Sequence, residues 1–170
     1  EDDCVVCPAG SCCSTGAAVA TECSPGTVQP LLEQGTCDKC AAGSFQEQEG
    51  QTACASCPGG YYCTEGSSAG LPCPAGRYQN ATLSLLGISM TSADDCVVCP
   101  AGSFCSTGAA VATECSPGTV QPLVEQGACD MCPSGSFQHV AGATACVSCL
   151  PGSFCEDGAS AALPCPLGSY

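Results

Sequence analysis

The chain is almost without cationic side chains. Lys39 and Arg77 are its only lysine and arginine, against 16 carboxylates, and the formal net charge is −14. Phosphate backbones and anionic membrane surfaces repel a chain of this charge, which argues against nucleic-acid binding. No run approaches 18 consecutive apolar residues, so we expect no transmembrane helix and no direct membrane insertion.

Aromatic residues and histidine are equally scarce. Trp is absent, and there are only four Phe and four Tyr, so a conventional layered core would be poorly filled. His139 is the only histidine, which removes most Ser-His and Cys-His catalytic arrangements, and we expect it at the surface. No bulky segment is present that could bury and tune a pair of carboxylates. We therefore expect no enzymatic activity and no cofactor.

Cysteine, in contrast, is abundant. The chain has 21 Cys among 170 residues, a content typical of disulfide scaffolds in extracellular or cell-surface proteins. In the chain-entropy model, a disulfide that closes a loop of about 15 residues contributes roughly 3 kcal/mol, and one that closes about seven residues roughly 2.4 kcal/mol. Covalent closure can thus replace much of the missing core.

The cysteines follow a short period. A unit restarts every 16 or 17 residues, with one longer exception. Six of the ten units begin Cys-Pro-x-Gly, all ten have Gly at position four, and seven have Phe or Tyr at position six. The unit starts are Cys7, Cys23, Cys40, Cys57, Cys73, Cys99, Cys115, Cys132, Cys149 and Cys165. Proline and glycine at these positions predict a turn directly after each leading cysteine. Strand-like pieces of three to five residues without helical periodicity predict short hairpins, with the aromatic residue at position six covering the disulfides.

A longer period lies over the short one. Residues 4–40 reappear as residues 96–132 with four changes, at an offset of 92 residues. A fixed period indicates stacked copies of one device. We therefore divide the chain into a first cysteine-rich block, residues 1–95, and a second, truncated block, residues 96–170. Two nearly interchangeable copies argue against one unique active site.

Each complete unit contains two cysteines, which predicts one disulfide within each unit. The expected pairs are Cys7 with Cys13, Cys23 with Cys37, Cys40 with Cys54, Cys57 with Cys63, Cys73 with Cys96, Cys99 with Cys105, Cys115 with Cys129, Cys132 with Cys146, and Cys149 with Cys155. An interleaved scheme, with Cys37 bound to Cys54 and Cys40 to Cys57, is the main rival, because sequence alone does not determine connectivity.

Three cysteines remain outside this scheme. Cys12 occupies the aromatic position, so it stays free and half-buried, competes with Cys13 for Cys7, or links to another chain. Cys4 corresponds to Cys96 and Cys165 to Cys73, so both face outward. We expect Cys165 of one copy to bond the Cys4 equivalent of the next copy, head to tail, within a longer array.

The unit from Cys73 to Cys99 is longer and contains the most apolar stretch, residues 79–90. Two interpretations stay open: an extended hairpin that packs its Leu and Ile on a neighbouring unit, or a contact surface between copies or chains. Asn80-Ala81-Thr82 is also the only N-glycosylation sequon, so Asn80 is a candidate glycan site.

Cys37, Cys40, Cys54 and Cys57 have a spacing that would suit a zinc ribbon, because two close pairs of thiolates can surround a tetrahedral ion. The many further cysteines at other spacings argue against it. We therefore predict no metal site, and keep a metal-binding cysteine cluster as a third hypothesis for the chain.

The segment Cys40-Ala41-Ala42-Gly43-Ser44-Phe45-Gln46 with Cys54 and Cys57, and its equivalent from Cys132 to Cys149, resemble the cysteine-rich repeats of ephrin-receptor-like proteins. They also resemble the opening modules of tumour-necrosis-factor-receptor domains. The resemblance implies an elongated, disulfide-laddered ectodomain, as used in receptors and in adhesive or fibrous surface proteins. It says little about function.

The expected fold is a small disulfide-rich, elongated tandem array of short β-hairpin and loop units with little or no helix. The leading functional hypothesis is a structural segment of an extracellular filament, cell-surface appendage or matrix, whose partners are copies of itself and glycans. The alternative is a ligand-binding receptor ectodomain.

Overall fold

A computed structural model describes residues 4–79, 85–87 and 90–169. The chain divides into two compact units: Glu1–Pro72 with Thr82–Asp95, and Cys73–Ala81 with Cys96–Tyr170. One border between the two compact units lies between Asp95 and Cys96. The short segment Cys73–Ala81 belongs to the second unit because a disulfide joins Cys73 to Cys96 and a strand pair lies beside it.

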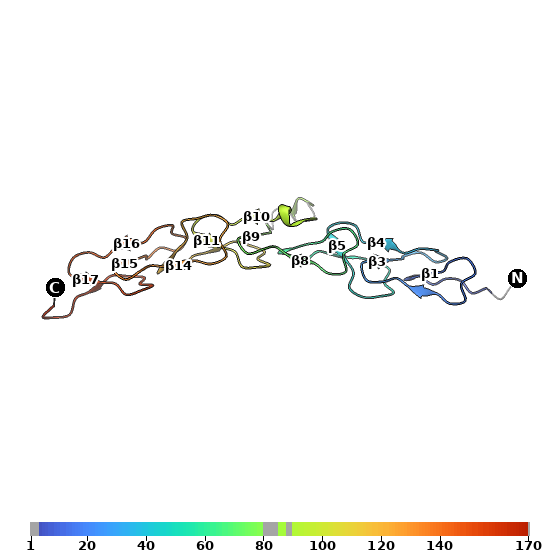
Figure 1. Ribbon diagram of the computed structural model, residues 1–170, viewed down its shortest axis with the longest axis horizontal. Coiled ribbons are helices and arrows are strands. Elements are labelled where there is room, and N and C mark those ends of the chain that lie inside the picture. The colour runs from blue at the N-terminus through green and yellow to red at the C-terminus, as the bar shows by residue number, and fades with distance from the viewer. Residues whose placement is uncertain (1–3, 80–84, 88–89, 170) are drawn as a thin grey trace. The chain divides into compact units, whose positions relative to one another are not determined.

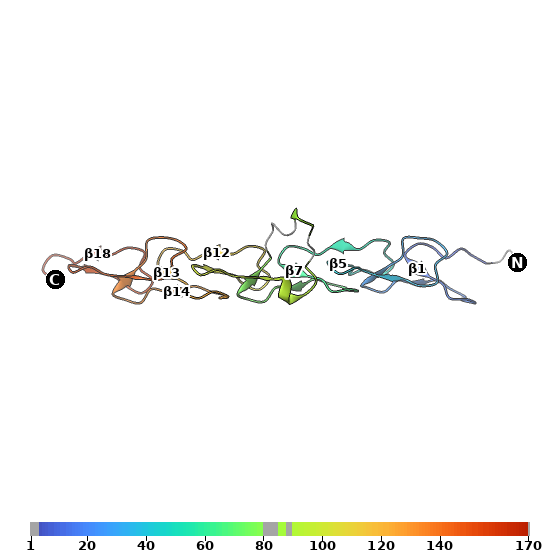
Figure 2. The same cartoon turned by 90° about the horizontal axis from the view of Figure 1, so that it is seen from above.

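The regular structure consists of two-residue strands in antiparallel pairs. In the first compact unit these are β1 (Ser11–Cys12) with β2 (Thr21–Glu22), β3 (Thr27–Val28) with β4 (Asp38–Lys39), β5 (Ser44–Phe45) with β6 (Ala55–Ser56), and β7 (Tyr61–Tyr62) with β8 (Leu71–Pro72). In the second they are β9 (Arg77–Tyr78) with β10 (Val97–Val98), β11 (Ser103–Phe104) with β12 (Thr113–Glu114), β13 (Thr119–Val120) with β14 (Asp130–Met131), β15 (Ser136–Phe137) with β16 (Val147–Ser148), and β17 (Ser153–Phe154) with β18 (Leu163–Pro164). Within each compact unit the hairpins follow one another in chain order (Figures 1 and 2).

Among the described residues, helical structure is confined to the 3-10 turn η1 (Ala93–Asp95) and to Leu85. The expectation of a disulfide-rich tandem array of hairpins with little helix is therefore confirmed. The expected strand length of three to five residues is wrong, since each strand in the described ranges has two.

The turn after each leading cysteine has the geometry that its sequence predicts. In the unit that starts at Cys132, the Ser136 N–H donates to the Pro133 carbonyl at 3.0 Å, and Gly135 has a φ of 81°. Glycine at the third position of such a turn is the signature of a type II turn. The Ser136 hydroxyl also donates to the Pro133 carbonyl, at 2.7 Å, which explains the preference for Ser or Thr at position five.

Successive units are interlocked through the glycine at position four. The Gly118 N–H donates to the Gln138 carbonyl of the next unit at 2.7 Å, and the Gly118 carbonyl accepts from the Cys132 N–H at 2.9 Å. A Cβ on Gly118 would clash with the backbone carbonyl of Gly158, two units further on. Glycine is thus required both for its positive φ and for the close approach of a distant backbone.

Sulfur forms most of the interior. Among the described residues, the fully buried side chains are Cys23, Cys40, Cys63, Cys73, Cys99, Cys105, Cys115 and Cys132. The other buried apolar residues are Cys7, Cys96, Cys155, Val28, Val120 and Met90. Those aromatic residues of position six that the structure describes lie on the short strands and are half-buried, apart from Phe154, which is 39% exposed. The fold therefore depends on disulfides and backbone hydrogen bonds rather than on an apolar core.

Candidate functional site: the joint between repeated units

The structure contains nine disulfides, and each lies within one sequence unit. The pairs are Cys7–Cys13, Cys23–Cys37, Cys40–Cys54, Cys57–Cys63, Cys73–Cys96, Cys99–Cys105, Cys115–Cys129, Cys132–Cys146 and Cys149–Cys155. These are the pairs of the nearest-neighbour scheme. Their Cα atoms lie between 5.7 and 6.2 Å apart, as disulfides require.

Sequence reasoning missed a glutamine that replaces cysteine at position seven. Units with a short disulfide loop have Cys at this position, whereas the units that start at Cys23, Cys40, Cys73, Cys115 and Cys132 have Gln. Gln121 is only 3% exposed; its Nε2 donates to the Ala128 carbonyl at 2.8 Å, and its Oε1 accepts from the Leu123 N–H at 3.1 Å. Ala128 directly precedes the loop-closing Cys129. The Gln121 side chain thus bridges the two ends of the longer disulfide loop. The sequence signal for this bridge was Gln at position seven in the units whose second cysteine comes later.

We expect Gln121→Ala to destabilise its loop by about 2 kcal/mol, because it removes two part-buried hydrogen bonds, those to the Ala128 carbonyl and from the Leu123 N–H. Amide hydrogen exchange at Leu123 measures the effect. Gln126→Ala is the matched control, since the Gln126 side chain also donates to a backbone carbonyl, that of Val124, but in an exposed position. Equal exchange rates at Leu123 in the two variants would contradict the proposed clamp.

The most complete joint between units lies at Cys73, inside the second compact unit. Besides the disulfide to Cys96, the Gly76 N–H donates to the Cys105 carbonyl at 2.8 Å, and the Gly108 N–H donates to the Cys73 carbonyl at 2.8 Å. The Cys99 N–H in turn donates to the Gly76 carbonyl at 2.9 Å. We call the segment 73–79 the inserted strand, because segment 96–109 holds it by backbone hydrogen bonds and segment 125–127 contacts its side chains.

Two side chains close this joint. Arg77 Nε lies 2.6 Å from Glu125 Oε1, and its guanidinium also donates to the Cys96 carbonyl at 3.3 Å. The arginine side chain is 28% exposed, so the pair is only partly solvated. Ala75 packs beside Gly127, where an added Cβ would lie 3.0 Å from the alanine Cβ. The Arg77–Glu125 pair joins positions that are 48 residues apart in the sequence.

Glu125 also has an unusual backbone. Glu33 and Glu125, which correspond at the offset of 92, both have a φ of 60°. Glycine occupies the same place in other units, at Gly50, Gly66, Gly108, Gly142 and Gly158, with φ between 69° and 75°. At each of these places the backbone N–H donates a hydrogen bond to the backbone carbonyl of the cysteine that begins the preceding unit. No sequence pattern indicated that Glu33 and Glu125 adopt a left-handed backbone.

We expect Glu33→Gly to stabilise the first compact unit by about 1 kcal/mol, because it removes the left-handed strain of a side-chain-bearing residue. Glu125→Gly is the matched variant: it relieves the same strain but also removes the partner of Arg77, so its gain should be smaller. Hydrogen exchange of the amide at each position, which donates to Cys7 and Cys99 respectively, measures both. A destabilising Glu33→Gly would contradict this explanation.

The segment before Cys96 ends in a carboxylate that closes a turn. Asp95 Oδ2 accepts hydrogen bonds from the Thr91 N–H at 2.7 Å, the Thr91 hydroxyl at 3.0 Å and the Ser92 N–H at 3.0 Å. The Thr91 backbone N–H is the main cause that lowers the pKa of Asp95 below its ordinary value of 3.8. The ionised carboxylate therefore favours the folded turn.

We expect this turn to be intact above pH 3.8 and to weaken as the pH falls through the lower pKa of the folded state. The pH dependence of the Thr91 amide chemical shift reports it. In Asp95→Asn the midpoint should disappear. A midpoint at or above the ordinary value in the unaltered protein would show that the hydrogen bonds do not favour the ionised form.

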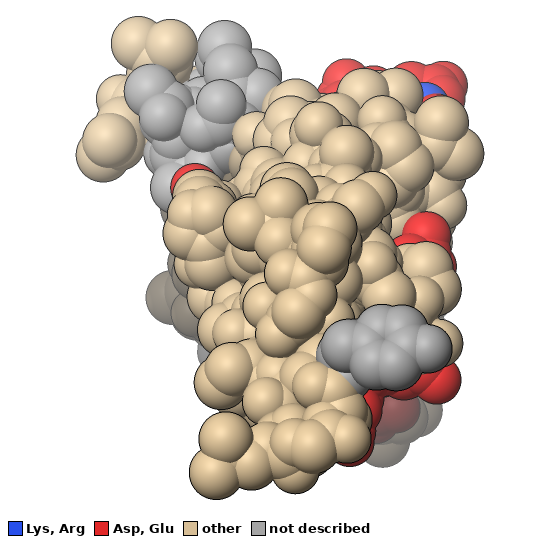
Figure 3. All heavy atoms as spheres, turned by 90° about the vertical axis from the view of Figure 1, so that its left-hand side faces the viewer, with Lys and Arg blue, Asp and Glu red and all other residues tan. Residues whose placement is uncertain are grey.

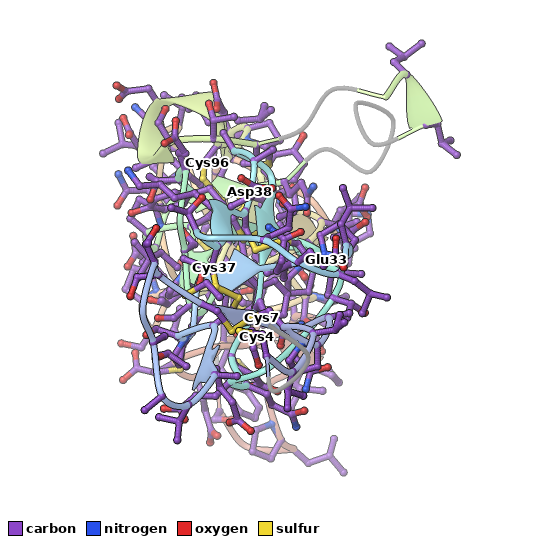
Figure 4. The ribbon with its side chains drawn as sticks, turned by 90° about the vertical axis from the view of Figure 1, so that its right-hand side faces the viewer. Cys4, Cys7, Glu33, Cys37, Asp38 and Cys96 are labelled. Carbon is purple, nitrogen blue, oxygen red and sulfur yellow. A yellow bond between two sulfur atoms is a disulfide. The ribbon has the colours of Figure 1, made fainter. Side chains whose placement is uncertain are left out.

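The three cysteines outside the disulfides are free thiols: Cys4 is exposed, and Cys12 and Cys165 are half-buried. Cys12 lies on β1, where Cys13 is bound to Cys7, so the competition for Cys7 does not arise in this structure. Figure 4 views the face that contains Cys4, beside Cys7, with Glu33 to one side. These residues, together with Val5, Val6 and Cys13, line one hollow of about 270 Å³.

The long unit differs from its expected packing. Leu85 is 87% and Leu86 70% exposed, so the expectation that its leucines pack on a neighbour is wrong for these two. Met90 is buried instead, at 2% exposed, and its carbonyl accepts from the Cys63 N–H at 3.1 Å. The buried side chain of this segment is thus Met90 rather than Leu85 or Leu86. Leu83, Ile88 and the candidate glycan site Asn80 lie outside the described residues.

The remaining sequence candidates are dispersed. All four cysteines of the zinc-ribbon spacing, Cys37, Cys40, Cys54 and Cys57, are in disulfides and offer no thiolate. In the part of the chain that the structure describes, no three His, Cys, Asp or Glu residues gather as a metal site would require. His139 is exposed, 6.1 Å from the Phe137 ring between centroids. Within the same described residues, no helix has the length and apolarity that a membrane span requires.

A family model described as tyrosine-protein kinase ephrin type A/B receptor-like matches residues 26–69 and 118–161. The two matches have the same offset as the internal duplication. No curated protein matches the chain. Such repeats, together with their disulfides, are typical of extracellular cysteine-rich domains. Because the matched segments cover just over half of the chain, the protein belongs to this family of ephrin-receptor-like cysteine-rich repeats.

Proposed function

We propose that this chain is a structural segment of an extracellular filament, cell-surface appendage or matrix. One observation carries the proposal: the two copies use equivalent residues for equivalent contacts. The Gly10 N–H donates to the backbone carbonyl of Gln29 at 2.7 Å in the first copy. In the second copy the Gly102 N–H donates to the backbone carbonyl of Gln121, also at 2.7 Å. Equivalent residues in the two copies thus form the contacts that join neighbouring units.

The surface supports the same role. Lys39 pairs with Glu65 at 3.3 Å and Arg77 with Glu125 at 2.6 Å, so the two basic side chains are already engaged with carboxylates of the chain. An excess of negative charge keeps extended surfaces soluble and disfavours lateral collapse. The proposed role is non-enzymatic, with copies of the chain and a glycan on Asn80 as partners.

Electron microscopy of the native material tests this proposal. We expect regular fibres with an axial repeat that corresponds to one 92-residue copy. Monodisperse short particles that capture a soluble protein would contradict it and favour the second candidate, a ligand-binding receptor ectodomain. The family match supports that candidate, because the family is named for receptors.

The glycan is tested separately on the same material. Peptide mass spectrometry after enzymatic removal of N-glycans should show Asn80 converted to aspartate. An unmodified Asn80 peptide from untreated native protein would rule the glycan out, without bearing on the structural role.

A further inference from the structure

The first copy presents the groups that hold the inserted strand, but on an open face. Residues 4–20 correspond to residues 96–112, and Glu33 corresponds to Glu125. In the second copy these residues surround the segment 73–79, through the disulfide of Cys96, the carbonyl of Cys105 and the N–H of Gly108. In the first copy Cys4 is a free, exposed thiol. Val5 is 94% exposed, whereas its counterpart Val97 is half-buried in the pair with Tyr78.

This open face is hollowed where the inserted strand lies in the second copy. A hollow of about 480 Å³ is lined by residues 4–6, 8, 13, 14 and 16–20, and it adjoins the smaller one beside Cys7 and Glu33. Of the counterparts of these residues, Cys105, Gly108 and Ala109 form backbone hydrogen bonds to Gly76, Cys73 and Gln79. The hollow thus has the lining that receives one extended segment of backbone.

The chain also contains a second segment of the inserted kind. Cys165–Ser169 corresponds to Cys73–Arg77, and Gly168 has a φ of 90° where Gly76 has 85°. A Cβ on Gly168 would meet nothing within 4 Å, whereas one on Gly76 would clash with the Glu125 carbonyl. Leu167 is fully exposed, at 108%, and Cys165 is a free thiol. The same turn is therefore present, with its contact face open.

The face that contains this segment is suited to contact with a like chain. Figure 3 shows it as mostly uncharged, with carboxylates gathered along one side. For a chain with a net charge of −14, an uncharged face is where two copies repel each other least.

We propose that the segment Cys165–Ser169 of one copy inserts into the hollow of residues 4–20 of a second copy, and that a Cys165–Cys4 disulfide seals it. The proposal rests on the structural role above and names its joint. By correspondence with Gly76, the Gly168 N–H donates to the Cys13 carbonyl, and the Gly168 carbonyl accepts from the Cys7 N–H.

Two substitutions distinguish this joint from the internal one. Ser169 replaces Arg77, so no cation reaches Glu33, and Leu167 replaces Ala75, so a larger apolar side chain lies over Gly35. The joint between copies is thus apolar where the internal joint is electrostatic, so it contains no ion pair that salt could weaken. Because each copy has a net charge of −14, added salt should favour the association of copies by screening their mutual repulsion.

The disulfide step requires an oxidant, for which a low-molecular-weight disulfide such as oxidised glutathione suffices. The Cys165 thiolate attacks the glutathione disulfide, which gives a mixed disulfide and releases one reduced glutathione. The Cys4 thiolate then attacks the Cys165 sulfur, forms the Cys165–Cys4 bond and displaces the second reduced glutathione. Two thiols lose two protons and two electrons in all, and the glutathione disulfide gains them.

A mixing experiment in the Cys12→Ser background tests the joint. One variant also has Cys165→Ser and retains only the Cys4 thiol; the other has Cys4→Ser and retains only the Cys165 thiol. In a glutathione redox buffer, we expect the mixture to form a covalent dimer of twice 16.6 kDa at least about tenfold faster than either variant alone. Mass mapping of the nine internal disulfides checks that both variants fold.

Leu167→Asp and Leu150→Asp, introduced into the variant that retains Cys165, separate docking from random collision. Both residues are exposed leucines, but only Leu167 lies in the proposed joint. Leu167→Asp should slow the cross-link about tenfold, and Leu150→Asp should leave it unchanged. Dimers of one variant that form as fast as mixed dimers, or equal rates in the two aspartate variants, would overturn the proposal. Native fibres without a Cys4–Cys165 link would overturn this joint alone and leave the structural role intact.

Discussion

Gly118→Ala is expected to destabilise the second compact unit by about 4 kcal/mol. The left-handed φ of 89° costs an alanine about 1 kcal/mol. The added methyl group also clashes with the Gly158 carbonyl, and Gly158 lies two units away. Because that atom is backbone, it yields only if the hairpins separate, at roughly 3 kcal/mol. Hydrogen exchange of the Gly118 and Gly158 amides, which donate to Gln138 and Cys132, measures the loss.

Gly135→Ala is the matched control. Gly135 has nearly the same φ, 81°, and the same turn, but a Cβ there would meet nothing within 4 Å. This variant should therefore lose only about 1 kcal/mol, the cost of the left-handed backbone. Similar losses in both variants would show that the contact between alternate units contributes little, and that glycine is needed only for the turn.

Complete reduction of the disulfides is expected to abolish the fold. Each loop of about 15 residues loses roughly 3 kcal/mol of stabilisation, and each loop of about seven roughly 2.4 kcal/mol. Among the described residues, the buried apolar side chains other than cysteine are Val28, Val120 and Met90, which cannot compensate. Amide exchange before and after reduction and alkylation measures the change.

The control for reduction is alkylation without reduction, which modifies the free thiols alone and should leave amide protection unchanged. Native-like protection in the fully reduced chain would contradict the account. It would show that the backbone ladder between units holds without its covalent closures.

The sequence predicted the hairpin array and its turns because these depend on local residues. Proline, glycine and the leading cysteine determine each turn within five residues, and the period of the cysteines places the next one. The family resemblance, read from the motifs at Cys40 and Cys132, is confirmed by the family model that matches residues 26–69 and 118–161.

The joints between units could not be predicted in the same way. The approach of Gly118 to Gly158 joins residues 40 positions apart through backbone atoms, which leave no mark in side-chain patterns. The left-handed backbone of Glu33 and Glu125 was hidden because glycine is the usual residue there. The presence of either Cys or Gln at position seven could have indicated the hydrogen bonds that the Gln121 side chain forms within its loop. The spacing of the cysteines alone does not indicate them.

The most direct test of the central claim is disulfide mapping of the native material by peptide mass spectrometry without reduction. We expect the nine disulfides within units, together with one cross-linked peptide that joins Cys165 to Cys4. A Cys40–Cys57 link would contradict the closure of units, and free Cys4 and Cys165 thiols in assembled fibres would contradict the covalent joint between copies.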